Sequence, residues 1–141
     1  ICGERKIEGS EQRELGSIIA VVATDALLLP HQLKRLATRV SLGVGRQGGY
    51  AGNGSGDIFV AFSTANENSW ASPEATITML SNDRLDQLFT ATVHATEAAI
   101  TNAMLAAETM TGANGVRVHE LPVGQMMEVM RVHNRVPETD N

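Results

Sequence analysis

The sequence contains a single cysteine, Cys2, and few aromatic residues, which make up 4% of its 141 residues. One cysteine excludes an intrachain disulfide and a cysteine-based zinc site. Four scattered histidines do not supply a metal site in its place. We therefore expect neither a disulfide scaffold nor a bound metal.

Basic residues are also scarce. Eleven Lys and Arg against sixteen Asp and Glu give a formal net charge of −5, and no basic cluster is interleaved with aromatic residues. Binding to nucleic acid depends on such clusters, because they neutralise phosphates and stack on bases. We expect no nucleic-acid partner.

Long hydrophobic runs are absent. The longest are Ile18–Ala23 and Ala26–Pro30, far below the roughly 20 residues that span a bilayer. The chain does not open with a basic stretch followed by an apolar one, as a signal peptide does. We expect a cytoplasmic protein without membrane contact, or a periplasmic one if a signal lies in a preceding segment.

The composition and the apolar pattern of the chain change at position 17. Residues 1–16 are rich in charge and lack a periodic apolar pattern, which predicts a linker or the tail of an amino-terminal segment. Residues 17–141 are predicted to form part of a larger single domain, since 43% of the chain is hydrophobic and can fill a core. The apolar run from Ile18 to Ala23 is typical of a strand buried on both faces of its sheet.

The remaining patterns alternate between helix and strand, which predicts an α/β fold. Helices are expected over Pro30–Leu42, over Asn82–Thr111 with Gly112 as terminator, and from Pro122 onward. Strands are expected over Asp57–Thr64, Thr76–Leu80 and Val116–Leu121, and the tail after Arg135 is expected to fray. The apolar stripe of the longest helix indicates core packing and no cofactor site; it consists of Leu85, Leu88, Phe89, Thr92, Ala95, Ala99, Ala103, Met104 and Ala107.

Seven glycines lie between Gly43 and Asp57, a density that predicts a long loop because glycine destabilises helix and strand interiors. Residues Gly43–Gly48 match the spacing G-x-G-x-x-G of dinucleotide-binding proteins. That motif requires a strand before it and a helix after it. Here the match follows a helix and leads into more glycine, which argues against nucleotide binding.

The junction Gly16-Ser17 precedes the first buried strand and could take part in a specific reaction. If the bond before Ser17 is broken, one residue carries both a hydroxyl nucleophile and an α-amine. That amine titrates near pH 8 and can take the hydroxyl proton. Taken alone, the pair is more typical of a turn residue followed by the start of a strand.

A second candidate is Asn53-Gly54-Ser55-Gly56-Asp57, where a hydroxyl and a carboxylate stand two residues apart. In a strand conformation Ser55 and Asp57 lie on the same face, which suits a hydrogen-bond relay. The alternative is a glycine-rich turn in which both side chains bind local backbone N–H groups.

Three segments together decide between these readings. Residues 16–26, 28–37 and 54–66 closely resemble the carboxy-terminal subunit of the DmpA-type aminopeptidases, a family that includes the β-peptidyl aminopeptidases. The resemblance covers nearly the whole chain from Gly16 onward. It implies an α-β-β-α sandwich, similar in fold to the ornithine acetyltransferases, and a precursor that cuts itself before a serine.

The resemblance also implies roles for individual residues. Ser17 corresponds to the nucleophile, exposed by cleavage of the Gly16–Ser17 bond, Ser55 to a second active-site serine and Asp57 to an acidic partner. The implied reaction releases amino-terminal residues from small peptides, amides or esters through an acyl-enzyme, without a cofactor. The implied partner is the amino-terminal segment of the same precursor, which in relatives contributes oxyanion-hole contacts, and the processed heterodimers are expected to form a homo-oligomer.

Two other functions stay open. An acyltransferase of the ornithine acetyltransferase type shares the implied fold, but its nucleophile is threonine, and Ser17 argues against it. A non-enzymatic fragment that binds a partner is the second alternative, because only sixteen residues precede Ser17 in this chain.

Overall fold

The computed structural model describes residues 16–67, 69–71 and 73–136. They belong to two compact units, one within residues 14–100 and one that includes the residues from 101 onward. The tail or linker predicted over residues 1–16 lies outside the described residues except for Gly16. Residues 137–141 of the tail predicted to fray lie outside them as well.

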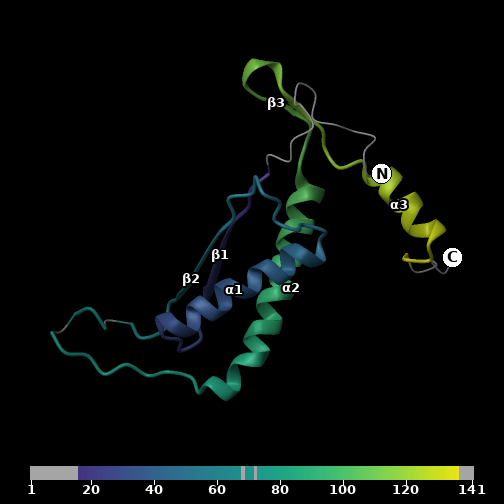
Figure 1. Cartoon of the computed structure of the whole chain (residues 1–141). Helices are drawn as coiled ribbons and strands as arrows, with labels where there is room; N and C mark the ends of the chain where they lie inside the picture. The colour runs from purple at the N-terminus through teal and green to yellow at the C-terminus, as the bar shows by residue number, and fades with distance from the viewer. Residues whose placement is uncertain (1–15, 68, 72, 137–141) are drawn as a thin grey trace. The chain divides into compact units, whose positions relative to one another are not determined.

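The first unit contains a parallel pair of strands, β1 (Ile19–Thr24) and β2 (Ile58–Ser63), which run side by side (Figure 1). Their register pairs Ile19 with Ile58 and Thr24 with Ser63. Both strands were predicted to within one residue at each end. A helix lies between them in the sequence, as a parallel pair requires, and the predicted α/β class is confirmed.

Helix α1 (Pro30–Arg46) connects the two strands and packs through one face. Proline occupies its first turn, as predicted, and the Gln32 side chain accepts a hydrogen bond from the Leu29 N–H at 3.1 Å. The buried positions recur every three or four residues, which is the spacing of a single helical face; they are Gln32, Leu36, Val40 and Gly43.

The predicted end of this helix at Leu42 is wrong, because α1 continues for four residues into the glycine-rich segment. Gly43 lies against α2, and a Cβ atom at this position would be 2.6 Å from the Thr96 Cβ atom. The absence of a side chain at Gly43 therefore allows the two helices to approach each other closely.

A short 3-10 turn (Asn82–Arg84) leads into α2 (Leu85–Ala106). The helix ends five residues before the predicted Thr111, because Met110–Thr111 form a strand, and Gly112 is therefore not its terminator. The predicted apolar stripe is correct only in part. The buried residues are Leu85, Phe89, Thr92 and Thr96, whereas Ala95 and Ala99 are exposed.

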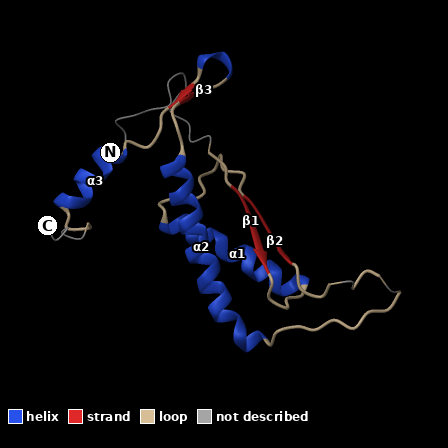
Figure 2. Cartoon of the chain, turned by 180° about the vertical axis from the view of Figure 1, so that it is seen from behind, coloured by secondary structure: helices blue, strands red, loops and turns tan. Residues whose placement is uncertain are grey.

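The core of the first unit lies between the strands, α1 and the start of α2, elements that Figure 2 shows from behind. Its buried cluster consists of Leu28, Leu36, Leu85 and Phe89. The Arg39 guanidinium lies 3.9 Å from the centre of the Phe89 ring, a cation–π contact that joins α1 to α2. The fully buried Gln32 amide donates hydrogen bonds to the Leu80 carbonyl at 2.8 Å and to the Asn82 side chain at 3.0 Å.

The strand predicted over Thr76–Leu80 does not form. The backbone of Thr78 instead pairs with the Asn66 side chain, which accepts from its N–H at 2.9 Å and donates to its carbonyl at 3.0 Å. A side-chain amide thus takes the place that a neighbouring strand would have.

The two faces of the β1–β2 pair differ. One carries residues that pack into the core, among them Val22 and Ala61. The other carries apolar side chains that are 44–71% exposed, and we call it the open sheet face; its residues are Ile19, Val21, Ile58, Val60 and Phe62. The prediction of burial on both faces is therefore wrong for the described residues, because none of them covers this side.

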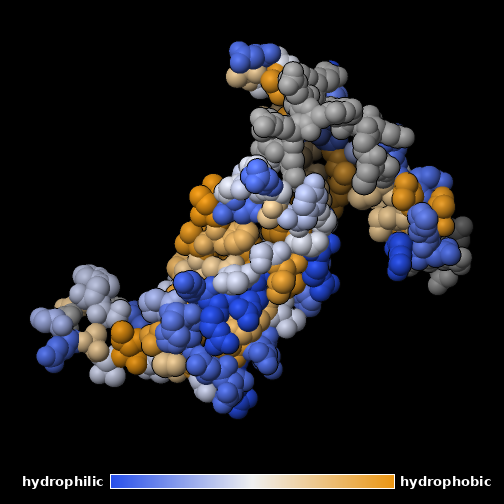
Figure 3. All heavy atoms as spheres, in the orientation of Figure 1, coloured by the Kyte–Doolittle hydropathy of each residue, from blue (hydrophilic) through white to orange (hydrophobic). Residues whose placement is uncertain are grey.

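Hydrophilic residues gather over α1, with hydrophobic residues beside them where the strands run (Figure 3). Of the helices in the described ranges, none combines the length and apolar character needed to cross a membrane.

The second unit contains a short antiparallel pair, β3 (Met110–Thr111) and β4 (Arg117–Val118), followed by α3 (Val123–Val132). A 3-10 turn, Ala113–Gly115, connects the strands. The strand predicted over Val116–Leu121 is thus reduced to two residues, whereas the helix predicted from Pro122 is confirmed. Beyond the pair, Thr109 and Glu120 exchange two hydrogen bonds between backbone N–H groups and side chains.

Candidate active site at the start of the parallel strands

The parallel register brings two distant segments together. Because β1 and β2 start at the same edge of the sheet, the residues directly before them become neighbours. These are Ser17 and Ile18 before β1, and Ser55 to Asp57 before β2. The Ile58 N–H donates to the Ile18 carbonyl at 3.0 Å and extends the pairing to this edge.

Three hydrogen bonds connect the two segments and their side chains. The Gly56 N–H donates to the Ser17 Oγ at 2.9 Å. The Ile18 N–H donates to the Asp57 Oδ1 at 3.0 Å, and the Ser55 hydroxyl donates to the same oxygen at 2.6 Å. A continuous set of contacts therefore joins Ser17, Ser55 and Asp57.

The loop before β2 is shaped for this arrangement. The Ser55 N–H donates to the Gly52 carbonyl at 2.8 Å, which closes a turn. Ala51 adopts a φ of 49°, in the left-handed region that costs a non-glycine residue energy. The loop therefore holds Ser55 and Gly56 toward the start of β1.

The two hydrogen bonds to Asp57 affect its titration. The Ser55 hydroxyl and the Ile18 N–H both favour the charged carboxylate and hold the pKa of Asp57 below its ordinary value. Asp57 is therefore ionised at neutral pH and acts only as an acceptor.

This geometry has a defined chemical capacity. The Ser55 proton is directed at Asp57, so the lone pairs of the Ser55 oxygen are available to accept a proton or a hydrogen bond from another group. Ser17 is exposed and its Oγ is held by a backbone donor. An exposed, oriented hydroxyl beside a charged relay suits nucleophilic attack.

All three side chains predicted from the sequence lie in this cluster, and Gly16 is exposed next to it. The sequence interpretation missed two backbone groups, the N–H of Gly56 and that of Ile18. The only signal in the sequence was that Gly56 and Ile18 stand directly next to the candidate residues Ser55, Asp57 and Ser17. The catalytic roles of these residues stay predictions.

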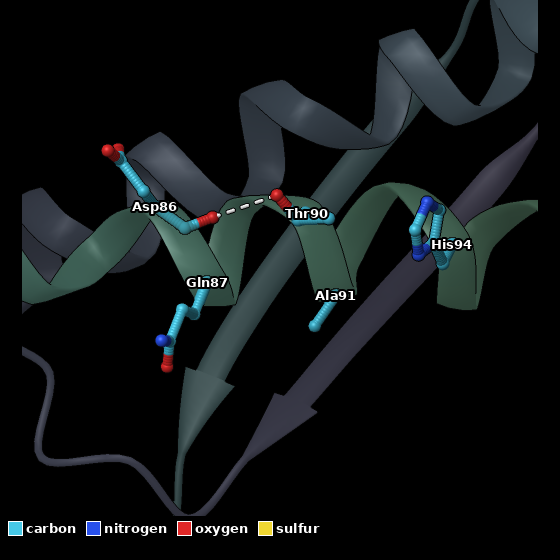
Figure 4. A pocket seen from close by; sticks show the side chains of 5 residues that line it. All are labelled: Asp86, Gln87, Thr90, Ala91 and His94. Atoms are coloured by element: carbon cyan, nitrogen blue, oxygen red, sulfur yellow. Dashed lines mark hydrogen bonds between the residues drawn. The ribbon is translucent and has the colours of Figure 1, made fainter.

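A surface hollow of about 440 Å³ lies elsewhere, along α2 (Figure 4). It is lined by Asp86, Gln87, Thr90, Ala91 and His94, and the Thr90 hydroxyl is bound to the Asp86 carbonyl at 3.0 Å. All five residues are exposed, so the hollow is an open surface. Across the described ranges, no group of three or more His, Cys, Asp or Glu side chains is placed to hold a metal ion.

Comparisons with known proteins point to one family. Residues 2–118 match the model of peptidase family S58. Over 123 residues the chain is 50% identical to a beta-peptidyl aminopeptidase of Sphingosinicella microcystinivorans, a match that covers 86% of this chain and 31% of the relative.

Solved structures agree with this result. The L-aminopeptidase D-Ala-esterase/amidase of Ochrobactrum anthropi, described as a variant of the Ntn hydrolase fold, superposes with a TM-score of 0.77 at 44% identity, over 86% of this chain and 35% of its own. A beta-aminopeptidase of Burkholderia sp. superposes with a TM-score of 0.74 at 39% identity, over 87% of this chain and 36% of its own. The chain thus spans about a third of the length of these relatives.

Proposed function

Because the chain belongs to peptidase family S58, we propose that it is the nucleophile-bearing part of a self-processing serine aminopeptidase. The observation that carries the proposal is the Ser17 hydroxyl, exposed and held at 2.9 Å by the Gly56 N–H beside the Ser55–Asp57 pair. Ser17 is the nucleophile in both self-cleavage and substrate hydrolysis.

Self-cleavage begins when the Ser17 Oγ attacks the carbonyl carbon of Gly16. An Oγ–C bond forms, the C–N bond to Ser17 breaks, and the hydroxyl proton passes to the departing nitrogen. Water then hydrolyses the ester, which leaves a carboxylate on Gly16 and a free α-amine on Ser17. Among the described residues, apart from its chain neighbours, none has an atom within 4 Å of the place where a Cβ on Gly16 would stand, so this side of the junction is sterically open.

In the processed enzyme the neutral α-amine of Ser17 is the general base. It takes the hydroxyl proton as the Oγ attacks a substrate carbonyl, and it returns the proton to the departing amine. Water reverses these steps to release the acyl group. The Ser55 oxygen accepts a hydrogen bond from the amine or the hydroxyl, while Asp57 keeps Ser55 oriented.

We propose substrates that present a free amino terminus, such as short peptides, amino-acid amides and esters, whose acyl carbonyl the Ser17 Oγ can attack. The names of the relatives support the same range, since they describe beta-peptidyl aminopeptidases and an L-aminopeptidase with D-Ala-esterase/amidase activity.

We propose the amino-terminal segment of the same precursor as the partner of this chain. The open sheet face supports it, because five neighbouring apolar side chains in water are unfavourable unless another layer covers them. A sheet of two strands is also marginal by itself, and the relatives are about three times as long as the matched region.

The experiment compares the complete protein with its Ser17→Ala and Gly16→Ala variants. We expect the parent and Gly16→Ala to be cut at position 17 and to release alanine from alanine amide, and Ser17→Ala to stay uncut and inactive. Intact mass and free alanine are measured. A normally cut Ser17→Ala variant contradicts the proposal.

Two further outcomes identify the alternatives. Transfer of an acetyl group from acetylornithine, without peptide-bond hydrolysis, would favour the acyltransferase. A folded protein that neither cuts itself nor acts on either substrate would favour the binding fragment.

A further inference from the structure

We propose that the backbone N–H of Gly56 is a catalytic group that holds and stabilises the Ser17 oxygen during acyl transfer. The inference rests on the proposed function and goes beyond its three side chains. It begins from the 2.9 Å hydrogen bond between the Gly56 nitrogen and the Ser17 Oγ.

The Gly56 N–H orients the Ser17 hydroxyl. A serine hydroxyl has one proton and two lone pairs, and Ser17 is exposed, so water competes for all three. The Gly56 N–H occupies one lone pair and limits the rotation of the Oγ. The second lone pair remains for the carbonyl carbon and the proton remains for the base.

The Gly56 N–H also interacts with the charge that develops on the Ser17 oxygen. The hydroxyl oxygen becomes more negative as its proton moves to the α-amine, and again when it departs as the leaving group in deacylation. A fixed N–H donor interacts more strongly with a negatively charged oxygen than with a neutral one. The Gly56 donor therefore lowers the barrier to formation and to breakdown of the acyl-enzyme.

At position 56 the backbone N–H, and not the lack of a side chain, is the important feature. The φ angle of Gly56 lies outside the left-handed region, so its backbone conformation does not require glycine. A Cβ added there would lie 3.5 Å from the Ser17 Oγ, an ordinary van der Waals contact. Glycine at position 56 is therefore required neither by its backbone conformation nor by the described atoms around it.

The donor is removed by replacing Gly56 with glycolic acid, which exchanges the N–H for an ester oxygen and leaves the chain otherwise unchanged. We expect kcat for alanine amide to fall about 100-fold, which is the lower end of what loss of one charge-stabilising donor costs. KM should stay near the parent value, because the N–H contacts the nucleophile and not the bound substrate.

A matched control replaces Ile58 with its α-hydroxy acid. The Ile58 N–H donates to the Ile18 carbonyl at 3.0 Å, a structural bond of the same kind in the adjacent strand pair. We expect this variant to keep most of the parent kcat. Circular dichroism and intact mass establish that each variant is folded and processed.

The outcomes distinguish the role of the Gly56 N–H from the proposed aminopeptidase function. A large kcat loss confined to the Gly56 ester supports the proposal. Parent kcat in that ester, or equal losses in both esters, overturns the role of Gly56 while the aminopeptidase function stands. A parent protein that neither cuts itself nor releases alanine overturns the function, and the role of Gly56 with it.

Discussion

Replacement of Gly43 by alanine tests the packing that supports the site. The added Cβ would lie 2.6 Å from the Thr96 Cβ, 2.8 Å from its Cγ2 and 2.9 Å from the Val93 carbonyl oxygen. Two of these atoms belong to a β-branched side chain that is stiff in a helix, and the third is backbone. Relief of the contact therefore requires α1 and α2 to move apart.

The magnitude follows from two opposing effects. Overpacking of a close-packed interior costs about 1–3 kcal/mol, and the short contacts to rigid atoms favour the upper end. Replacing glycine by alanine within a helix recovers about 0.5–1 kcal/mol. We expect Gly43→Ala to lower the free energy of unfolding by about 2 kcal/mol.

Gly45→Ala is the matched control. Gly45 lies in the same helix, two residues further along, and a Cβ there would meet no atom of the described residues within 4 Å outside the backbone of its own helix. This variant should gain up to about 1 kcal/mol, since only the helix effect remains.

Urea unfolding followed by helical circular dichroism measures the difference, which should appear as a midpoint lower by about 1 M in Gly43→Ala than in the parent. Adding Thr96→Gly removes the two nearest atoms and should reduce the penalty of alanine at position 43. Equal midpoints for Gly43→Ala and Gly45→Ala would refute the close approach of the helices.

Two further predictions concern the site edge and the open sheet face. Asp57→Asn in processed protein should lower turnover and move the alkaline-rising limb of the kcat/KM profile to lower pH, because the Ser17 ammonium loses a counter-charge. If the rate and the position of the limb are both unchanged, Asp57 is a loop-capping residue. The lowered pKa of Asp57 also means that its ionised carboxylate stabilises the fold at neutral pH and that this contribution is lost as pH falls from about 4 through the lowered pKa, a dependence that Asp57→Asn lacks. Val21→Lys, at a 63% exposed position, should leave α1 packing intact but abolish co-purification with the separately tagged amino-terminal segment. Unimpaired co-purification would argue against the open sheet face as the docking surface.

Much of the local structure could be predicted because it depends on neighbours in the sequence. Pro30 fits the first turn of a helix and no later one, and the apolar runs before Thr24 and Ser63 suit strands. The Gly16-Ser17 and Ser55-Gly56-Asp57 segments were identified as candidates by residue type and by their resemblance to a family.

The errors in the sequence interpretation share one cause: the outcome depended on which residues from other parts of the chain each segment meets, and the local pattern does not show this. Gly43 was placed in a loop because glycine disfavours helices, but contact with Thr96 outweighs that preference. Thr76–Leu80 has the composition of a strand and forms none, because the Asn66 side chain pairs with Thr78. Ile19 and Val21 suit burial, yet no described residue covers them.

By itself, therefore, the sequence determined which residues could form strands and helices and which hydroxyl and carboxylate could react. Only the tertiary structure decided that the Gly56 N–H meets the Ser17 oxygen and that Asp57 binds both Ser55 and the Ile18 N–H. The contacts of Gly56 with Ser17 and of Asp57 with Ile18 join residues 39 positions apart through backbone N–H groups. Every residue except proline carries the same N–H group, so its partner is set by the parallel register of β1 and β2 and not by residue type.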